Sequence, residues 1–482
     1  MENNKRLSPD INVSIKLLKD ALPIKRSFDV IGRELIIGQS TNAYLVFIDG
    51  FAKDDIMLWI LEVLQSLSES DLNNNAIDTL MKKKIGYIEV ERFSDIEQIR
   101  TMVLAGAVGL LVDGQDEAII IDSREYPVRS PEEPELEKVS RGSRDGLVET
   151  IIFNTALIRR RLRDPNLIFE ITTVGKRSKT DVVIAYLEDI ADKNLLKEIQ
   201  DKLGNIDVGA LVMAEKTLEE LLIKKHWYNP LPQAKFTERP DVVAAHLMEG
   251  HIAIIVDTSP SIMLLPVTMF HFTQHAEDYY QNILVGSYYR WVRFLGMLSA
   301  LLLPPLWLLL VQNIEMLPDW LQFLGPKEEY TIPLFIQLIL LEFGLDILRL
   351  SSIHTPSALN TSLGIIGGLI LSDLAVKVGM FVPETVLYMA LAGIGTFATP
   401  SLEFALALRI FRFILLILTG LLGFWGFVGG LIVVFILLLT SKSFKNGKPY
   451  TWPLIPLKLK PLAHILFRMP IPTIGEGNDD KS

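Results

Sequence analysis

The chain has 482 residues, of which 49% are hydrophobic and 22% are charged, with a formal net charge of −10 and no cysteine. The lack of cysteine excludes disulfides, thiolate metal ligands and thiol nucleophiles, and the acidic balance argues against nucleic acid as a partner. High hydrophobicity combined with many charges is typical of a soluble part joined to a membrane part.

Residues 1–127 carry strand, turn and helix signals that predict an α/β subdomain. Short β-rich runs at 28–31, 34–37 and 43–48 are punctuated by Gly38 and by Asp49-Gly50. Helical spacing predicts a helix over 54–67, and Ser94-Asp95-Ile96-Glu97 has the form of a capping box that opens a second helix, to about 104. The runs 109–112 and 118–121 flank Asp113-Gly114, which predicts a hairpin.

Residues 128–288 repeat this order and predict a second α/β subdomain. The stretch 41–54 aligns with 180–193, and 105–114 aligns with 249–258, at a nearly constant offset. Two matches in the same order favour a duplicated unit, and chance similarity of two hairpins is the alternative. The fold class that follows is an α/β part built from two repeated subdomains, followed by an all-α polytopic transmembrane domain.

A proline-rich, acidic stretch, Pro127 to Glu137, predicts a linker between the repeats, and a helix over about 147–163 follows it. This helix carries four arginines: Arg159, Arg160, Arg161 and Arg163. They predict a solvated face balanced by glutamates of the linker, or alternatively a contact with another subunit or with lipid headgroups. Thr237 is the expected N-cap of a helix that has Pro240 in its first turn.

Residues 289–441 predict a transmembrane helical domain, and 442–482 a basic tail. Neither 295–310 nor 413–440 contains an ionisable side chain, and a spanning helix needs about 20 apolar residues. Apolar segments near 294–312, 332–350, 361–380, 384–400 and 413–440 allow four to six spans. Basic residues before the first span and after the last, with an acidic loop after the first, place the N-terminal part and the tail on the cytoplasmic side.

The second and third apolar segments contain charges. Glu342, Asp346 and Arg349 share one helix face, and Asp373 and Lys377 are four apart and can pair. Ionisable groups in lipid are costly unless they face a bundle interior or water. These residues predict a polar pathway for ions. The alternative is a set of ion pairs that only hold helices in register, or side chains near the interface that reach out of the lipid.

Glycines occur in two of these segments. Leu363 to Leu369 is glycine-rich, which permits close helix contact or non-standard backbone near a pore. In the last segment Gly420, Gly423, Gly426 and Gly429 recur every third residue, which favours a packing stripe over a site.

Signatures of enzymes are lacking in the sequence. It has no Walker loop, no Rossmann fingerprint and no Gly-x-Ser-x-Gly elbow. His271 and His275 could present two imidazoles on one helix face, but no third ligand is implied. We predict no catalytic residue, no metal and no cofactor.

Several short motifs are spread over the chain. They are Arg141-Gly-Ser-Arg-Asp-Gly146, Leu157-Ile-Arg-Arg-Arg-Leu162, Thr237-Glu-Arg-Pro-Asp241, Val256-Asp-Thr-Ser-Pro260 and Glu277-Asp-Tyr-Tyr280. Together they resemble the GerA-type family, the A-subunit family of spore germinant receptors. The positions that match the family motif are Arg141, Gly142, Arg144, Gly146, Glu149, Asn154, Arg159, Arg160, Arg161, Thr237, Glu238, Arg239, Pro240 and Asp241.

A second set of motifs resembles a branch of this family other than the nutrient-receptor subunits. It comprises Tyr289-Arg-Trp-Val-Arg-Phe294, Ile353-His-Thr-Pro-Ser-Ala-Leu359, Gly395-Thr-Phe-Ala-Thr-Pro-Ser401 and Pro449-Tyr-Thr-Trp-Pro453. Leu348-Arg-Leu-Ser351 departs from the receptor A subunits, which usually have Arg-Glu-Ala in this region.

The resemblance implies a multi-pass protein of the spore inner membrane, the forespore cell membrane, with its N-terminal domain and tail on the core side. It implies a ring-like homo-oligomer whose glycine-rich segments, about Asn360 to Asp373, border an ion-conducting pore. The expected role is amplification of ion release during germination. The alternatives are a nutrient-receptor A subunit and a non-conducting signal-relay scaffold.

The expected partners are membrane lipids, further copies of the chain, a small membrane protein and, as further candidates, germinant-receptor B- and C-type subunits. The candidate residues of the ion pathway are Glu342, Asp346, Arg349, Asn360, Ser362, Asp373 and Lys377.

Overall fold

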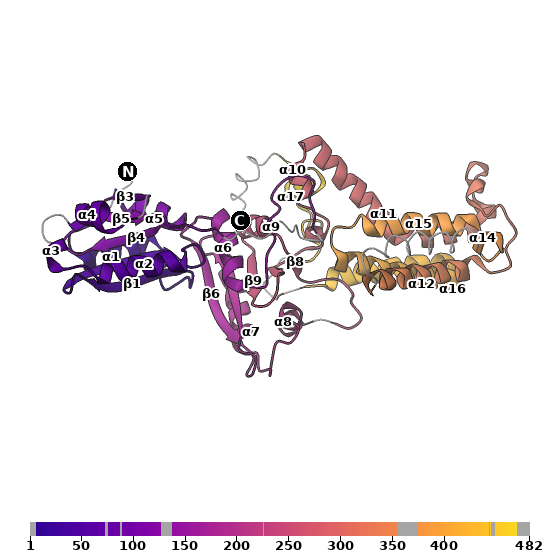
Figure 1. The fold of residues 1–482 in the computed structure, drawn as a ribbon. Helices are drawn as coiled ribbons and strands as arrows, with labels where there is room; N and C mark the ends of the chain where they lie inside the picture. The colour runs from indigo at the N-terminus through magenta and orange to yellow at the C-terminus, as the bar shows by residue number, and fades with distance from the viewer. Residues whose placement is uncertain are drawn as a thin grey trace. The chain divides into compact units, whose positions relative to one another are not determined.

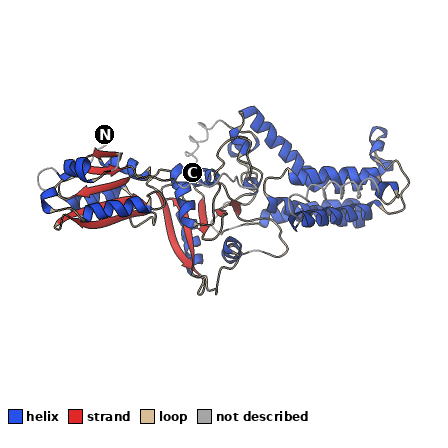
Figure 2. Cartoon of the chain, viewed as in Figure 1, coloured by secondary structure: helices blue, strands red, loops and turns tan. Residues whose placement is uncertain are grey.

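A computed structural model describes residues 6–72, 76–86, 89–126, 137–224, 226–354, 375–442, 444 and 449–469 (Figure 1). The chain forms two compact units. The α/β unit comprises 1–224, 234–266 and 444–446, and the helical unit comprises 225–233, 267–443 and 447–482. Strands occur in the first and not among the described residues of the second (Figure 2).

The first half of the α/β unit is an antiparallel sheet with helices on both faces. Its strands, in the order β1-β2-β4-β5-β3, are β1 (Val30–Ile37), β2 (Thr41–Ile48), β4 (Val108–Val112), β5 (Ala118–Ile121) and β3 (Val90–Phe93). One face packs on α1 (Ile11–Ala21) and α5 (Ile96–Leu104). The other packs on α2 (Asp54–Gln65), α4 (Ala76–Thr79) and the π-helical turn Leu80–Lys84, with α3 (Glu69–Leu72) beside them. Burial on both faces explains why β4 and β5 are apolar throughout.

The two short runs that the sequence predicts at 28–31 and 34–37 are one strand, β1, which pairs with β2 along its whole length. Gly32 does not break the strand. It lies opposite Val46, and a Cβ at this position would collide with the hydroxyl of Tyr44. The glycine therefore makes room for a buried tyrosine. The reversal comes at Gly38 and Gln39, both of which have positive φ.

The second half repeats this architecture, as the sequence predicts. Its strands, in the order β6-β7-β9-β10-β8, are β6 (Leu167–Val174), β7 (Thr180–Leu187), β9 (Ile252–Val256), β10 (Ile262–Leu265) and β8 (Lys235–Thr237). Its helices are α7 (Lys193–Gly204) and α8 (Ala214–Leu222) on one face, and α6 (Ile151–Arg161) and α9 (Pro240–Met248) on the other. The aligned strands β2 and β7 even share the same sequence of buried and exposed positions.

The predicted N-cap of α9 is wrong by two residues. Thr237 lies on β8, where it pairs with Ile262, and the N-cap of α9 is Arg239. Pro240 occupies the first helical turn as expected, since its missing N–H costs nothing there.

Of the four arginines in the predicted solvated face, Arg160 and Arg163 are exposed, whereas Arg159 is not. Arg159 is fully buried, and its Nε and Nη2 donate to the two oxygens of Asp29 at 2.9 and 3.1 Å. The same guanidinium donates to the carbonyls of Asp164 and Leu167. Arg160 lies 4.3 Å from the ring centroid of Tyr126. The ion pair therefore joins α6, and with it the second sheet, to the turn that precedes β1.

The helical unit contains a short lead-in, a bundle and a C-terminal helix. Its elements are the 3-10 turn Met269–Phe272, α10 (Glu277–Tyr280), α11 (Ile283–Gln312), the 3-10 turns Ile314–Met316 and Asp319–Leu324, α12 (Leu334–His354), α14 (Ala375–Lys377), α15 (Pro383–Phe397), α16 (Leu402–Thr440) and α17 (Leu459–Leu466). Among the described helices, α11 and α16 are long and apolar enough to cross a membrane. The predicted segment 361–380 lies largely outside the described residues.

The predicted segment 413–440 belongs to a helix that folds back on itself. Gly423 has φ 56° and ψ −133°, values outside the helical region. Beyond it Gly430 lies against Leu415, and Gly426 against the backbone of Leu418. In a straight helix Leu415 and Gly430 would be about 22 Å apart at 1.5 Å per residue. The apolar run is therefore two antiparallel arms joined at Gly423, and only glycine adopts such a backbone without strain.

The helices define two ends of the bundle. The first end contains the start of α11 and both ends of the α16 hairpin, since Phe272 stacks on Phe404 and Asn229 donates to Ser441. The second end contains Gln312, Gly423 and the start of α15, where Trp307 stacks on Tyr388 at 4.9 Å. The chain thus enters α11 and leaves α16 at the same end.

We predict that Asp29→Ala destabilises the α/β unit by roughly 3 to 5 kcal/mol, because it leaves the buried guanidinium of Arg159 unpaired. Thermal unfolding of the full chain, followed by circular dichroism, measures the effect. Asp20→Ala, at an exposed position, is the matched control. Equal melting temperatures for the two variants would contradict the role of the ion pair.

Candidate functional site

The most polar feature within the helical bundle is one buried carboxylate that contacts two arginines. Glu342 lies in the middle of α12, and Arg409 and Arg412 lie on the first arm of α16, three residues apart and therefore on one helix face. All three are buried, with exposed fractions of 2%, 8% and 1%. The cluster lies in a helix pair whose surroundings are almost entirely apolar.

Every oxygen of the Glu342 carboxylate accepts a hydrogen bond from a guanidinium. Arg409 Nε donates to Oε1 at 2.9 Å, and Arg412 donates to Oε1 and Oε2 at 2.8 and 3.0 Å. Arg412 Nη1 also donates to the carbonyl of Ala300 on α11 at 2.7 Å. Hydrogen bonds between ionised partners are about twice as strong as neutral ones. The cluster therefore ties three helices of the bundle to one carboxylate.

A second carboxylate balances the charge of the cluster. Arg409 Nη1 lies 2.7 Å from Asp346 Oδ1, one helical turn beyond Glu342. The side chain of Asp346 is 45% exposed, whereas that of Glu342 is 2% exposed. The cluster thus extends from the interior of the bundle to its surface at Asp346.

An uncharged cluster joins α12 to α15 near the second end. Gln337, which is fully buried, accepts hydrogen bonds from Val382 N at 2.9 Å and Thr385 Oγ1 at 3.0 Å, and donates to Ile332 O at 2.8 Å. The amide oxygen and the amide nitrogen each bond to protein groups. This arrangement fixes the register of the two helices.

The structure brings together two of the predicted residues of the ion pathway. Glu342 and Asp346 meet in the cluster, Arg349 lies one turn further along α12, and Lys377 is exposed on α14. Asn360, Ser362 and Asp373 lie outside the described residues. Because both Glu342 oxygens are engaged by arginines, this residue matches the alternative of an ion pair that holds helices in register.

Arg409 and Arg412 are absent from the residues that the sequence singles out. The last predicted apolar segment begins at Phe413, immediately after the second arginine, so both arginines lie outside it. The available signal was a pair of arginines three residues apart inside the apolar stretch 402–440. Two cations on one face of a membrane helix require a buried anion, and Glu342 is such an anion on another segment.

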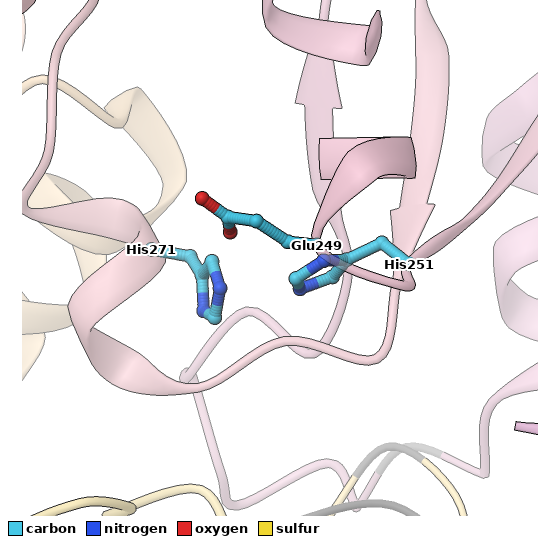
Figure 3. A group of neighbouring side chains, drawn as sticks. All are labelled: Glu249, His251 and His271. Atoms are coloured by element: carbon cyan, nitrogen blue, oxygen red, sulfur yellow. The ribbon is translucent and has the colours of Figure 1, made fainter. Parts of the chain in front are cut away.

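Figure 3 labels three side chains with metal-binding chemistry, Glu249, His251 and His271. Glu249 and His251 follow α9 in the α/β unit, whereas His271 belongs to the helical unit. His251 Nδ1 contacts the carbonyl of His246, and His271 Nδ1 accepts from Thr268 N, so both rings have protein partners. Neither unit by itself supplies a set of three ligands here, and we infer no metal site from them.

Comparison with known proteins identifies the family. Residues 16–478 match the family model described as the Bacillus/Clostridium GerA spore germination protein. The chain belongs to the GerA spore germination family. It is 42% identical over 450 residues to stage V sporulation protein AF of Bacillus subtilis (strain 168), covering 93% of this chain and 90% of the relative.

Other members of the GerA family are more distant. Spore germination protein KA of the same organism is 31% identical, covering 95% of this chain and 85% of the relative. The crystal structure of the N-terminal domain of the A subunit of the Bacillus megaterium spore germinant receptor GerK3 is 27% identical and has a TM-score of 0.43. It covers 55% of this chain and 97% of that chain. That score is too low for an argument about the fold.

The family-motif residues form a folded loop in this GerA-family chain. Asn154 on α6 accepts from Val148 N at 2.8 Å and donates to Val148 O at 2.6 Å. Arg239 donates to the carbonyls of Glu137 and Ser143 at 3.1 and 2.9 Å. These contacts hold residues 137–148, which lack regular secondary structure, against the helices α6 and α9.

An ion pair fixes the same loop to the end of α6. Arg161 Nη2 lies 2.6 Å from Asp145 Oδ2. Burial by itself would raise the pKa of Asp145, but hydrogen bonds from Arg161 and Ser143 outweigh burial, and the pKa lies below its ordinary value. The ion pair thus holds the loop within the fold.

We predict strong coupling between Glu342 and Arg412. Glu342→Gln leaves the buried guanidinium of Arg412 without an anion, while Arg409 keeps Asp346, and costs roughly 3 to 5 kcal/mol. Adding Arg412→Gln removes that unpaired charge, so the double variant is destabilised by less than the sum of the single variants. Thermal unfolding of the full chain in detergent, arranged as a double-mutant cycle, measures this coupling.

The matched control for this cycle pairs Asp319→Asn with Arg412→Gln, since Asp319 is exposed in a 3-10 turn outside the cluster. These two changes should add without coupling. Additive effects of Glu342→Gln and Arg412→Gln would show that the cluster does not hold the helices together.

Proposed function

We propose that this GerA-family protein spans the spore inner membrane with its helical unit and forms, as a ring-like oligomer, an ion-conducting channel that amplifies ion release during germination. Its similarity to stage V sporulation protein AF supports a role in the spore. A membrane location is supported by α11 and α16, which have the length and apolar composition of spanning helices.

The topology of the bundle supports several crossings with a common side for the ends of the domain. The arms of α16 on either side of Gly423, 402–422 and 424–440, contain 21 and 17 residues, within the range that a spanning helix needs. Because α11 begins and α16 ends at the first end of the bundle, the α/β unit and the tail would share one side of the membrane. The positive-inside rule assigns that side to the core of the spore.

The observation that carries the proposal is the exposure of Asp346. In a single bundle surrounded by lipid, a half-exposed carboxylate on α12 would contact hydrocarbon, and such contact costs several kcal/mol even for a paired ion. Covering this face with another copy of the chain, or with water along an oligomer axis, removes the cost. Arg349, one turn away on the same helix, extends the polar strip.

A non-conducting relay or a nutrient-receptor A subunit is the second candidate. The observation that favours it is the complete engagement of Glu342 by Arg409 and Arg412 inside one protomer. A receptor complex would add B- and C-type subunits as partners, whereas the channel would use a small membrane protein.

Cation efflux from liposomes containing the purified full chain tests the proposal. We predict measurable efflux for the unmodified protein and an approximately tenfold slower efflux for Asp346→Asn. The substitution leaves Arg409 without its surface carboxylate, so the pathway becomes more positive and loses the local enrichment of cations.

Asp319→Asn removes an exposed carboxylate from a 3-10 turn and serves as the control, with efflux expected to equal that of the unmodified chain. Absence of efflux from an assembled oligomer would favour the non-conducting relay. Equal efflux from Asp346→Asn and the control would place the pathway away from α12.

A further inference from the structure

The C-terminal segment of the helical unit exposes an unusual run of apolar residues. Residues 454–460 read Leu-Ile-Pro-Leu-Lys-Leu-Lys and are all exposed. Leu457 and Leu459 have exposed fractions of 60% and 73%. Among the described residues 449–469 there is no acidic side chain, and Lys458, Lys460 and Arg468 are basic. The apolar part of this surface is unfavourable in water unless it is covered, and the basic side chains beside it suit an anionic partner.

Buried arginines attach this segment to the start of α11. Arg290 Nη1 donates to the carbonyls of His464 and Ile465, at 2.7 and 3.0 Å, at the end of α17. Arg468 N donates to Ser287 Oγ at 3.0 Å, and the rings of Trp291 and Phe467 lie 5.9 Å apart. The position of α17 along α11 is therefore fixed.

That position coincides with the expected headgroup layer. The apolar run of α11 begins after Arg293, so Arg290 lies about 5 Å and Ser287 about 9 Å before the hydrocarbon at 1.5 Å per residue. The headgroup layer is roughly 5 to 8 Å thick on each side. The contact at Arg290 thus lies at the depth of the lipid headgroups, and the contact at Ser287 just beyond their outer edge, if α11 spans the bilayer.

Other parts of the first end expose residues suited to the same layer. Tyr288, Tyr289 and Trp291 on α11 are exposed, and Trp227, in a loop that contacts the end of α16 through Asn229, has an exposed fraction of 97%. Amphipathic aromatic rings favour the membrane interface. Exposed aromatic and aliphatic side chains therefore occur on three separate stretches of the chain near this end.

We infer that residues 454–468 form a peripheral anchor that lies on the membrane and binds anionic lipids. Leu454, Ile455, Leu457 and Leu459 enter the headgroup–acyl boundary, and Lys458 and Lys460 contact the headgroup phosphates. Apolar insertion combined with basic side chains is the usual chemistry of interfacial helices. The inference rests on the proposed membrane crossing of α11.

A single nitroxide label tests the anchor, because the chain has no native cysteine. Leu457→Cys in the full chain is labelled and placed in nanodiscs of phosphatidylcholine, with or without phosphatidylglycerol. The accessibility of the label to oxygen and to a water-soluble nickel chelate is compared. We expect oxygen to be favoured, and more so with phosphatidylglycerol.

Neutral lysine variants test the role of charge. Lys458→Gln with Lys460→Gln should reduce the enrichment of the segment at anionic membranes about fivefold per lysine. Lys193→Gln with Lys197→Gln, an exposed pair on α7, is the matched control and should change nothing. High salt should weaken the effect of phosphatidylglycerol in the unmodified chain.

Two further labels distinguish failure of the proposed anchor from failure of the proposed membrane crossing. Leu298→Cys, exposed on α11, should report hydrocarbon, and Ile36→Cys, exposed on β1, should report water. A label at 298 that reports water would overturn the proposed crossing itself. A label at 298 in hydrocarbon with a label at 457 in water would overturn only the anchor.

Two other outcomes would also overturn the anchor. Protection of the label at 457 from both reagents would mean that a second copy or another protein covers the segment. Equal insertion into both lipid mixtures, unaffected by the lysine variants, would mean that contact is purely apolar and that anionic lipid is not recognised.

Discussion

The helical unit depends on one carboxylate that contacts two arginines away from water. Glu342 is the only anion that both Arg409 and Arg412 contact among the described residues, and Arg412 carries the connection on to α11. An arginine cannot shed its proton at physiological pH, so each guanidinium must keep an anion in a low-dielectric interior. The arrangement of α11, α12 and α16 follows from that requirement.

Ion pairs between a buried carboxylate and arginine also occur at two other junctions of the chain. Asp278 accepts from both Arg290 and Arg293 where the chain enters α11, and Asp29 accepts twice from Arg159 where α6 meets the turn before β1. Geometry-specific ion pairs supply orientation at these points, while burial of apolar surface supplies most of the stability.

The repeated sheets can be predicted from the sequence because the residues that specify each strand and each turn are neighbours in the chain. Short β-rich runs and turns at Gly38 or Asp113-Gly114 can be recognised without knowledge of their partners, and the two copies support each other. The N-cap of α9 was missed because Thr237 satisfies the composition of a cap while its backbone pairs in β8. Residue propensity alone does not distinguish a helix N-cap from a strand position for Thr237.

The interior of the bundle was less predictable, because its determinants are non-local. Glu342 was found, but its partners lie 67 and 70 residues away, and the segment boundary at 413 hid them. The reversal at Gly423 was invisible because glycines recur every third residue there, and nothing in the sequence distinguishes the one with positive φ. Hydropathy shows that a segment is apolar, but it does not show whether the helix reverses direction within that segment.

A cryo-EM reconstruction of the purified oligomer in nanodiscs tests the central claim most directly. The account predicts that Glu342 stays paired with Arg409 and Arg412 inside each protomer, while Asp346 faces a neighbouring copy or a water-filled axis. An assembly, or a lone protomer, in which Asp346 faces lipid would contradict it.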